Sequence, residues 1–173
     1  MTDSFAHCLK LDRIREGERV ELAADERERR AIADRLGLEA LDRLEAHATL
    51  SRKGAIIGAR GRILASLDQS CVVTGERVPA YVDEAFDLLF VPEPEGGRSD
   101  EEIELESSDC DVVFHDGSRI DLGSAIADTL ALTLDPYPRS AGAEAVLKEA
   151  GVLTESEASP FAVLAKLKKT DEA

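Results

Sequence analysis

Cysteine and histidine are the residue types in this chain that could bind a metal or supply a nucleophile. The three cysteines are an odd number without paired ligand spacing, and the three histidines also stand singly. We therefore predict three free thiols in a reducing compartment and no bound zinc. The residues concerned are Cys8, Cys71, Cys110, His7, His47 and His115.

Two further features invite a catalytic or nucleotide-binding interpretation. Asp121 lies between a strand pattern and a helical pattern, where a helix needs an oxygen acceptor, and no Lys, His or second carboxylate is placed by sequence to tune it. We therefore predict a helix cap. The sequence GARG at residues 58–61 lacks the Lys-Ser/Thr of a phosphate loop and lies within a strand pattern. No catalytic residue and no cofactor is predicted, and the chain is not expected to be an enzyme.

Basic residues near the middle of the chain form the best local candidate for contact with RNA phosphate. No acidic residue lies between positions 46 and 67, and the basic residues there belong to one predicted hairpin. Aromatic stacking residues are absent from this hairpin, so readout of single-stranded bases is not expected. The RNA-contact candidates are Arg52, Lys53, Arg60 and Arg62.

Charge is distributed unevenly along the chain, which has a formal net charge of −15. Residues 1–70 contain 13 Lys/Arg and 13 Asp/Glu, whereas residues 71–157 contain 5 and 21. Carboxylates repel a phosphate backbone and attract basic protein surfaces, so the acidic half is expected to bind a basic protein rather than RNA. The alternative is that acidity serves only to keep the protein in solution. We also expect the acidic residues to gather on one side, apart from the basic hairpin.

Hydropathy patterns predict the elements of the first half of the chain. Alternation of Leu44, Ala46, Ala48 and Leu50 with polar residues is strand periodicity, and Gly37 ends a helical pattern. We expect the last three strands to pair consecutively and antiparallel. The predicted elements are strands at 7–14, 41–51, 56–73 and 80–91 and a helix at 24–37.

The second half begins with an acidic segment, residues 92–109, whose prolines, glycines and carboxylates predict a mobile loop. Asp116-Gly117 predicts a tight hairpin between strands at 110–115 and 118–120. A helix capped by Asp121 follows and ends before Pro136.

The C-terminal part is patterned less strongly. Residues 140–159 are expected to be weakly structured around a short helix at 143–150. An amphipathic helix is predicted at 160–168, and two interpretations of it remain open: packing on the sheet, or fitting into the groove of a partner.

Together these elements predict an α+β fold, with an antiparallel sheet of five to seven strands and three or four helices on one side or end. The length of 173 residues suits a single domain over 1–173. No secretory signal and no apolar stretch of about 20 residues is visible, so we expect a cytoplasmic protein.

Three segments in this order resemble the YceD-like family of large ribosomal RNA subunit accumulation proteins, long treated as a domain of unknown function. They are QSCVVT at 69–74, GSRIDLG at 117–123 and LTLDPYPR at 132–139, and the resemblance extends roughly over residues 7–168. Many members of that family carry Cys-x-x-Cys at the first segment and a second cysteine group after the third, a set suited to zinc. This chain has Thr74 in the second position and resembles a variant without the paired cysteines. The family-motif positions are Cys71, Thr74, Ile120, Asp121, Leu122 and Pro136.

The resemblance implies a bacterial, non-enzymatic factor that supports accumulation or processing of large-subunit (23S) ribosomal RNA and ribosome assembly. The partner we expect is a basic ribosomal or assembly protein, with precursor ribosomal RNA as a second candidate. No membrane and no small-molecule substrate is expected. The alternative is a general acidic interaction module unrelated to ribosomes.

Overall fold

The computed structural model describes residues 5–94 and 110–152 and divides the chain into two compact units. The first unit comprises Met1–Gln69 and Pro79–Pro136, and the second comprises Ser70–Val78 and Tyr137–Ala173. Each unit is described separately below.

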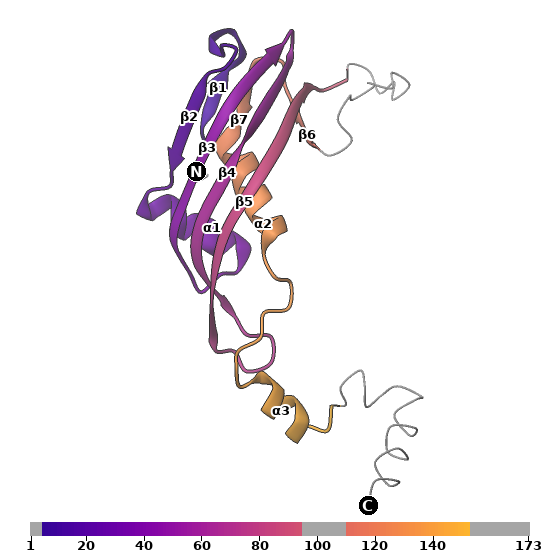
Figure 1. The fold of residues 1–173 in the computed structure, drawn as a ribbon. Coiled ribbons are helices and arrows are strands. Elements are labelled where there is room, and N and C mark those ends of the chain that lie inside the picture. The colour runs from indigo at the N-terminus through magenta and orange to yellow at the C-terminus, as the bar shows by residue number, and fades with distance from the viewer. Residues whose placement is uncertain (1–4, 95–109, 153–173) are drawn as a thin grey trace, which may run out of the picture. The chain divides into compact units, whose positions relative to one another are not determined.

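A five-stranded sheet forms the body of the first unit, in the order β2-β3-β4-β5-β6 (Figure 1). β3 and β4 pair antiparallel with Ala46 opposite Ile63, and β5 and β6 pair in parallel with Phe90 opposite Val113. The strands are β2 (Arg19–Ala23), β3 (Ala40–Lys53), β4 (Ile56–Ser70), β5 (Arg77–Pro92) and β6 (Asp111–His115).

Two helices, α1 (Glu26–Leu36) and α2 (Leu122–Thr133), cover one face of this sheet (Figure 1). Their buried residues, among them Ile32, Ile126 and Leu130, join one core with the inward side chains of the strands. Because the chain has no Trp and only five Phe, this core is mainly aliphatic. The opposite face, here called the outer face, carries the alternate side chains of each strand.

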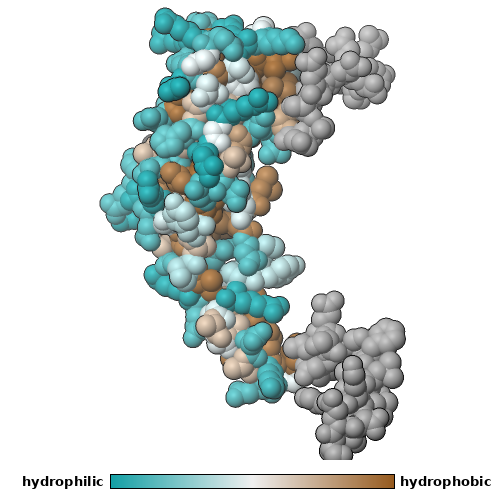
Figure 2. Space-filling model, viewed as in Figure 1, coloured by the Kyte–Doolittle hydropathy of each residue, from teal (hydrophilic) through white to brown (hydrophobic). Residues whose placement is uncertain are grey.

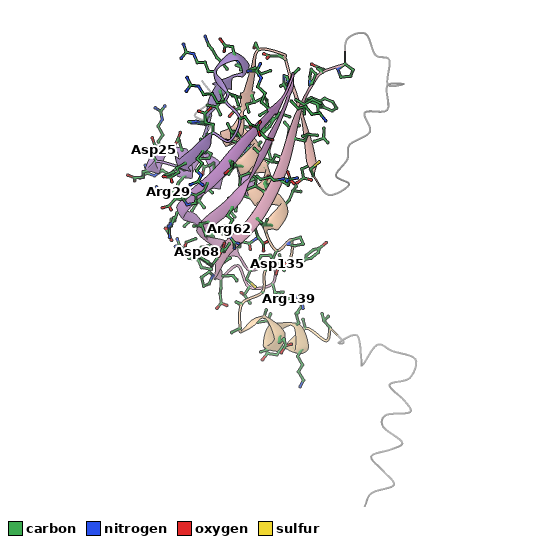
Figure 3. All side chains as sticks on the ribbon, turned by 45° about the horizontal axis from the view of Figure 1, so that its top comes forward. Asp25, Arg29, Arg62, Asp68, Asp135 and Arg139 are labelled. Atoms are coloured by element: carbon green, nitrogen blue, oxygen red, sulfur yellow. The ribbon has the colours of Figure 1, made fainter. Side chains whose placement is uncertain are left out.

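Helix α1 begins and ends where local hydrogen bonds require it. Asp25 and Glu28 form a capping box, in which each side chain accepts from the backbone N–H of the other at 2.8 Å. Arg29, close to Asp25 in Figure 3, donates to the Ala24 carbonyl at 2.8 Å. Gly37 ends the helix with φ +66°, a backbone conformation that favours glycine.

A second, two-stranded sheet attaches the N-terminal segment to the start of α2. β1 (Cys8–Lys10) pairs antiparallel with β7 (Arg119–Asp121), and a short 3-10 helix, η1 (Leu11–Arg13), follows β1. The Leu122 N–H donates to the His7 carbonyl at 3.1 Å. A Cβ atom on Gly123 would collide with the backbone of Phe5 and His7, so only glycine lets the N-terminal segment pass here.

In the second unit, a turn at residues 71–76 and a segment that ends in α3 (Ala143–Glu149) make contact through hydrogen bonds. The Val72 N–H donates to the Pro138 carbonyl at 3.0 Å, and Ala143 is fully buried.

The α+β class and the three long strands are confirmed. The predicted helices at 24–37, after Asp121 and at 143–150 are observed at Glu26–Leu36, Leu122–Thr133 and Ala143–Glu149. Four features differ from the sequence prediction. Strand β2 was not predicted, β6 joins the main sheet in parallel, and Asp116-Gly117 does not connect a hairpin, because β6 and β7 belong to different sheets. The strand predicted at 7–14 is limited to Cys8–Lys10. Most of the acidic segment 92–109 and the helix predicted at 160–168 lie outside the described residues.

Gly123→Ala tests the close approach at the start of α2. We expect it to lower the free energy of unfolding by about 1–3 kcal/mol, because the new methyl group meets backbone that a rotamer change cannot move. Gly142→Ala is the matched control: its nearest neighbour is a side-chain oxygen of Glu76 at 3.8 Å, so we expect a change of no more than about 0.5 kcal/mol. Urea unfolding of both variants makes the comparison, and equal stabilities would contradict the close approach.

Candidate functional site

Cys71, which directly follows β4, is the centre of a polar cluster in the second unit. Its side chain is buried, and its Sγ accepts from the backbone N–H groups of Ser140 at 3.2 Å and Thr74 at 3.4 Å. The Thr74 hydroxyl lies 3.1 Å from that of Ser140 and donates to a carboxylate oxygen of Glu76 at 3.1 Å. Two distant parts of the chain therefore meet around one sulfur atom.

The pKa values in this cluster favour a thiolate. Burial raises the pKa of Cys71, but hydrogen bonds from Thr74, Ser140 and Val73 more than compensate and lower it to about 6. Hydrogen bonds from Ser140 and Thr74 also lower the pKa of Glu76. The cluster thus holds negative charge by hydrogen bonding.

This cluster does not fit the structural zinc that the family resemblance implies. Such a site needs four thiolate or imidazole ligands, whereas Thr74 and Ser140 contribute hydroxyl groups beside the one sulfur. Within residues 5–94 and 110–152, no three His, Cys, Asp or Glu side chains gather as a metal site.

The four RNA-contact candidates all lie on the hairpin of β3 and β4, and three of them hold protein partners. Arg60 Nε donates to Asp87 at 2.7 Å and Arg62 Nη2 to Asp83 at 2.5 Å, across the outer face from β4 to β5. Figure 3 shows Arg62 on its strand. The hydrogen bond and charge of Asp83 raise the pKa of Arg62.

Arg52 has a different role at the tip of the same hairpin. Its Nη1 donates to the Leu11 carbonyl at 2.5 Å and its Nε to the Gly54 carbonyl at 3.1 Å, so it ties the hairpin to the N-terminal segment. Lys53 is exposed. The assignment of these residues to RNA stays a prediction.

The outer face mixes the two charge populations that the sequence analysis placed apart. Besides the two strand-to-strand pairs, Arg43 bonds Glu45 through both Nε and Nη2 at 2.8 and 2.6 Å. The carboxylates of Asp83 and Asp87 come from the acidic half of the chain and lie against arginines of the balanced half. The expected separation of acidic and basic surfaces therefore does not hold on this face.

The motif positions after residue 117 act in packing and capping. Ile120 and Leu122 are fully buried, and Asp121 Oδ1 accepts from the backbone N–H groups of Ser124 and His7, each at 3.1 Å. The predicted helix cap is confirmed. Exposed Pro136 follows α2, and the side chain of Gln69 donates to the Asp135 carbonyl at 2.9 Å, which fastens the end of that segment to β4.

A groove that sequence reasoning missed lies between β6 and the β7–α2 segment, with a volume of about 320 Å³. We call it the β6 groove. Its lining includes apolar Phe90, Val113 and Ile120, exposed Phe114, and the carboxylates of Asp116 and Asp128. The signal in the sequence was weak: Val112 and Phe114 are apolar and occupy alternate positions of a short strand, so they lie on the same face of it.

His115 fixes one end of the β6 groove. Its Nδ1 accepts from the Gly117 N–H at 3.0 Å, so its Nε2 donates to the Ala55 carbonyl at 2.9 Å in the neutral tautomer. Nε2 thus holds the end of β6 against the β3–β4 turn, while Nδ1 fixes the turn that follows β6.

These features define an α+β protein with an ion-paired sheet face and a groove beside an edge strand. A comparison with family models matches residues 59–168, more than half of the chain, to the family described as large ribosomal RNA subunit accumulation protein YceD. The chain belongs to the YceD family. Searches of curated proteins and of solved structures found no match. None of the helices in the described ranges has the length and apolar character needed to cross a membrane.

The Cys71 cluster predicts a low thiol titration midpoint. In a Cys8→Ser/Cys110→Ser variant, we expect the ultraviolet absorbance of the Cys71 thiolate to appear with a midpoint near pH 6 instead of 9. Because the folded-state pKa is lowered, the thiolate contributes stability above pH 9 that fades as the pH falls through 6. Cys71→Ser should remove that pH dependence. A midpoint near 9 would contradict the hydrogen-bonded thiolate.

Arg52 and Lys53 are neighbours with different expected roles. Arg52→Ala should lower the free energy of unfolding by about 1–2 kcal/mol, since it removes hydrogen bonds to two backbone carbonyls. Lys53→Ala should change it by less than about 0.5 kcal/mol. Chemical denaturation measures the free energy of unfolding of both variants. Equal values would show that Arg52 does not anchor the N-terminal segment.

Proposed function

We propose that the protein is a non-enzymatic factor that supports accumulation of large-subunit ribosomal RNA by binding a basic ribosomal or assembly protein. The observation that carries the proposal is membership of the YceD family over residues 59–168. That family is described by a role in large ribosomal RNA subunit accumulation.

Electrostatics favour a protein partner over RNA. Contact with RNA requires Lys and Arg that can displace counterions from phosphate, but Arg60 and Arg62 already pair with Asp87 and Asp83. The long-range field of a chain with net charge −15 attracts a basic protein and speeds its encounter. Arg52, Lys53, Arg60 and Arg62 remain the residues at which a contact with precursor ribosomal RNA would be sought.

The side chains most suited to catalysis have structural partners, which supports a non-enzymatic role. Asp121 caps α2 and accepts from the N-terminal segment, and both ring nitrogens of His115 are hydrogen-bonded. The sulfur of Cys71 is buried and accepts two backbone hydrogen bonds. A nucleophile needs an adjacent base and access to substrate, and none of these three side chains offers both.

Depletion of the protein in its host tests the proposal. We expect the ratio of large-subunit to small-subunit ribosomal RNA to fall, and a plasmid copy of the wild-type gene to restore it. An Arg60→Ala/Arg62→Ala variant should restore it equally well, because these arginines are engaged by Asp87 and Asp83. Quantitative RNA analysis and sucrose gradients measure the outcome. Unchanged ratios and gradients after depletion would refute a role in large-subunit ribosomal RNA accumulation.

A further inference from the structure

The strand β6 has a free edge within the described residues. It pairs there only with β5, over five positions from Leu88–Asp111 to Pro92–His115. An edge strand presents unpaired backbone N–H and C=O groups, and proteins commonly add an extended peptide to such an edge. The main chain of β6 can therefore hydrogen-bond an added strand of about five residues.

The side chains on β6 also leave apolar surface uncovered. Phe114 is 61% exposed and Val112 is 40% exposed. Figure 2 shows hydrophobic side chains gathered on the surface where β5 and β6 lie in Figure 1. Exposed apolar groups beside a free strand edge favour binding of a partner whose alternate side chains are apolar.

The β6 groove gives this edge a second wall. Lining residues come from β7 and the start of α2 as well as from β6, and the buried side chains of Phe90 and Ile120 form apolar lining. A peptide strand paired with β6 would place its alternate side chains along this groove. The groove therefore extends the contact beyond main-chain hydrogen bonds.

Charge around the groove selects the partner. Residues 110–136, which build β6, β7 and α2, contain five Asp and one Arg. Hydrogen bonds from Ser118 and the Arg119 backbone lower the pKa of Asp116 to about 2, so it is ionised at neutral pH, while Asp128 is paired with Arg35 at 3.0 Å. The sequence of segment 95–109 contains seven carboxylates and one Arg, a charge that does not complement these aspartates.

We propose that an extended segment of a basic protein, with Lys or Arg among apolar residues, adds as a strand to β6 and lies in the β6 groove. The free edge of β6 provides the main-chain pairing, Val112 and Phe114 provide apolar contact, and the surrounding aspartates attract the basic side chains. This inference rests on the proposed function and names the surface through which the partner binds.

The test uses the full chain and a fluorescent, end-blocked peptide of about eight residues in which Val alternates with Lys or Arg. We expect binding by fluorescence anisotropy that weakens as salt is raised. Replacing Lys and Arg in the peptide by Glu, or methylating alternate backbone amides, should abolish it. Hydrogen exchange of the β6 amides that do not pair with β5 should slow at least about tenfold with peptide.

Matched variants locate the contact. Phe114→Lys should weaken binding at least about tenfold, whereas Tyr81→Lys, at an equally exposed aromatic side chain (64%) on β5 outside the groove, should change it less than about twofold. Asp116→Lys should weaken binding more than Asp34→Lys, an exposed residue of α1.

Each contrary outcome overturns the inference. The inference fails if Phe114→Lys and Tyr81→Lys weaken peptide binding equally, or if the peptide leaves hydrogen exchange of the β6 amides unchanged. It also fails if the chain's own residues already protect these edge amides without peptide, or if an RNA oligonucleotide displaces the peptide.

The cellular assay separates this inference from the proposed function. If wild-type and Phe114→Lys genes restore the ribosomal RNA ratio equally, the groove is excluded and the function stands. If wild type does not restore it, the function itself fails.

Discussion

The junction of β7 with α2 is the constraint on which the first unit depends. Within four residues, Ile120 and Leu122 enter the core, Asp121 caps the helix, and Gly123 leaves room for the N-terminal backbone. Asp121 also accepts from the His7 N–H, so one carboxylate both caps α2 and holds the segment that leads into β1. If this junction failed, the five-stranded sheet would lose both its α2 cover and its N-terminal segment. The same junction forms one wall of the β6 groove.

Local hydrogen bonding and hydropathy made much of the fold predictable. The capping box at Asp25 and the left-handed glycine at position 37 delimit α1 through contacts within a few residues. Alternation along β3 reflects one buried and one exposed face. The cap at Asp121 is also a local contact, with the helix that immediately follows it, so it could be predicted from the sequence.

Long-range pairing explains what the sequence could not reveal. Asp116-Gly117 has the local composition of a hairpin, but the strands on either side find partners elsewhere in the chain, in β5 and β1. The Arg60–Asp87 and Arg62–Asp83 pairs join residues 27 and 21 positions apart, so charge counts along the chain could not predict that the two populations meet. The β6 groove is lined by residues of four elements, β5, β6, β7 and α2, which only the tertiary fold brings together.

Together these findings describe a protein in which Arg43, Arg60 and Arg62 on the outer face pair with carboxylates. The edge of β6 that is free within the described residues lies among aspartates. The most direct test of partner binding at β6 is photo-crosslinking in the host. A photoreactive amino acid replaces Phe114 and, as a control, Tyr81. The account predicts a crosslink from position 114, and not from position 81, to a Lys- or Arg-rich segment of a large-subunit ribosomal or assembly protein. A crosslink from position 114 to RNA, or equal crosslinking from both positions, would contradict it.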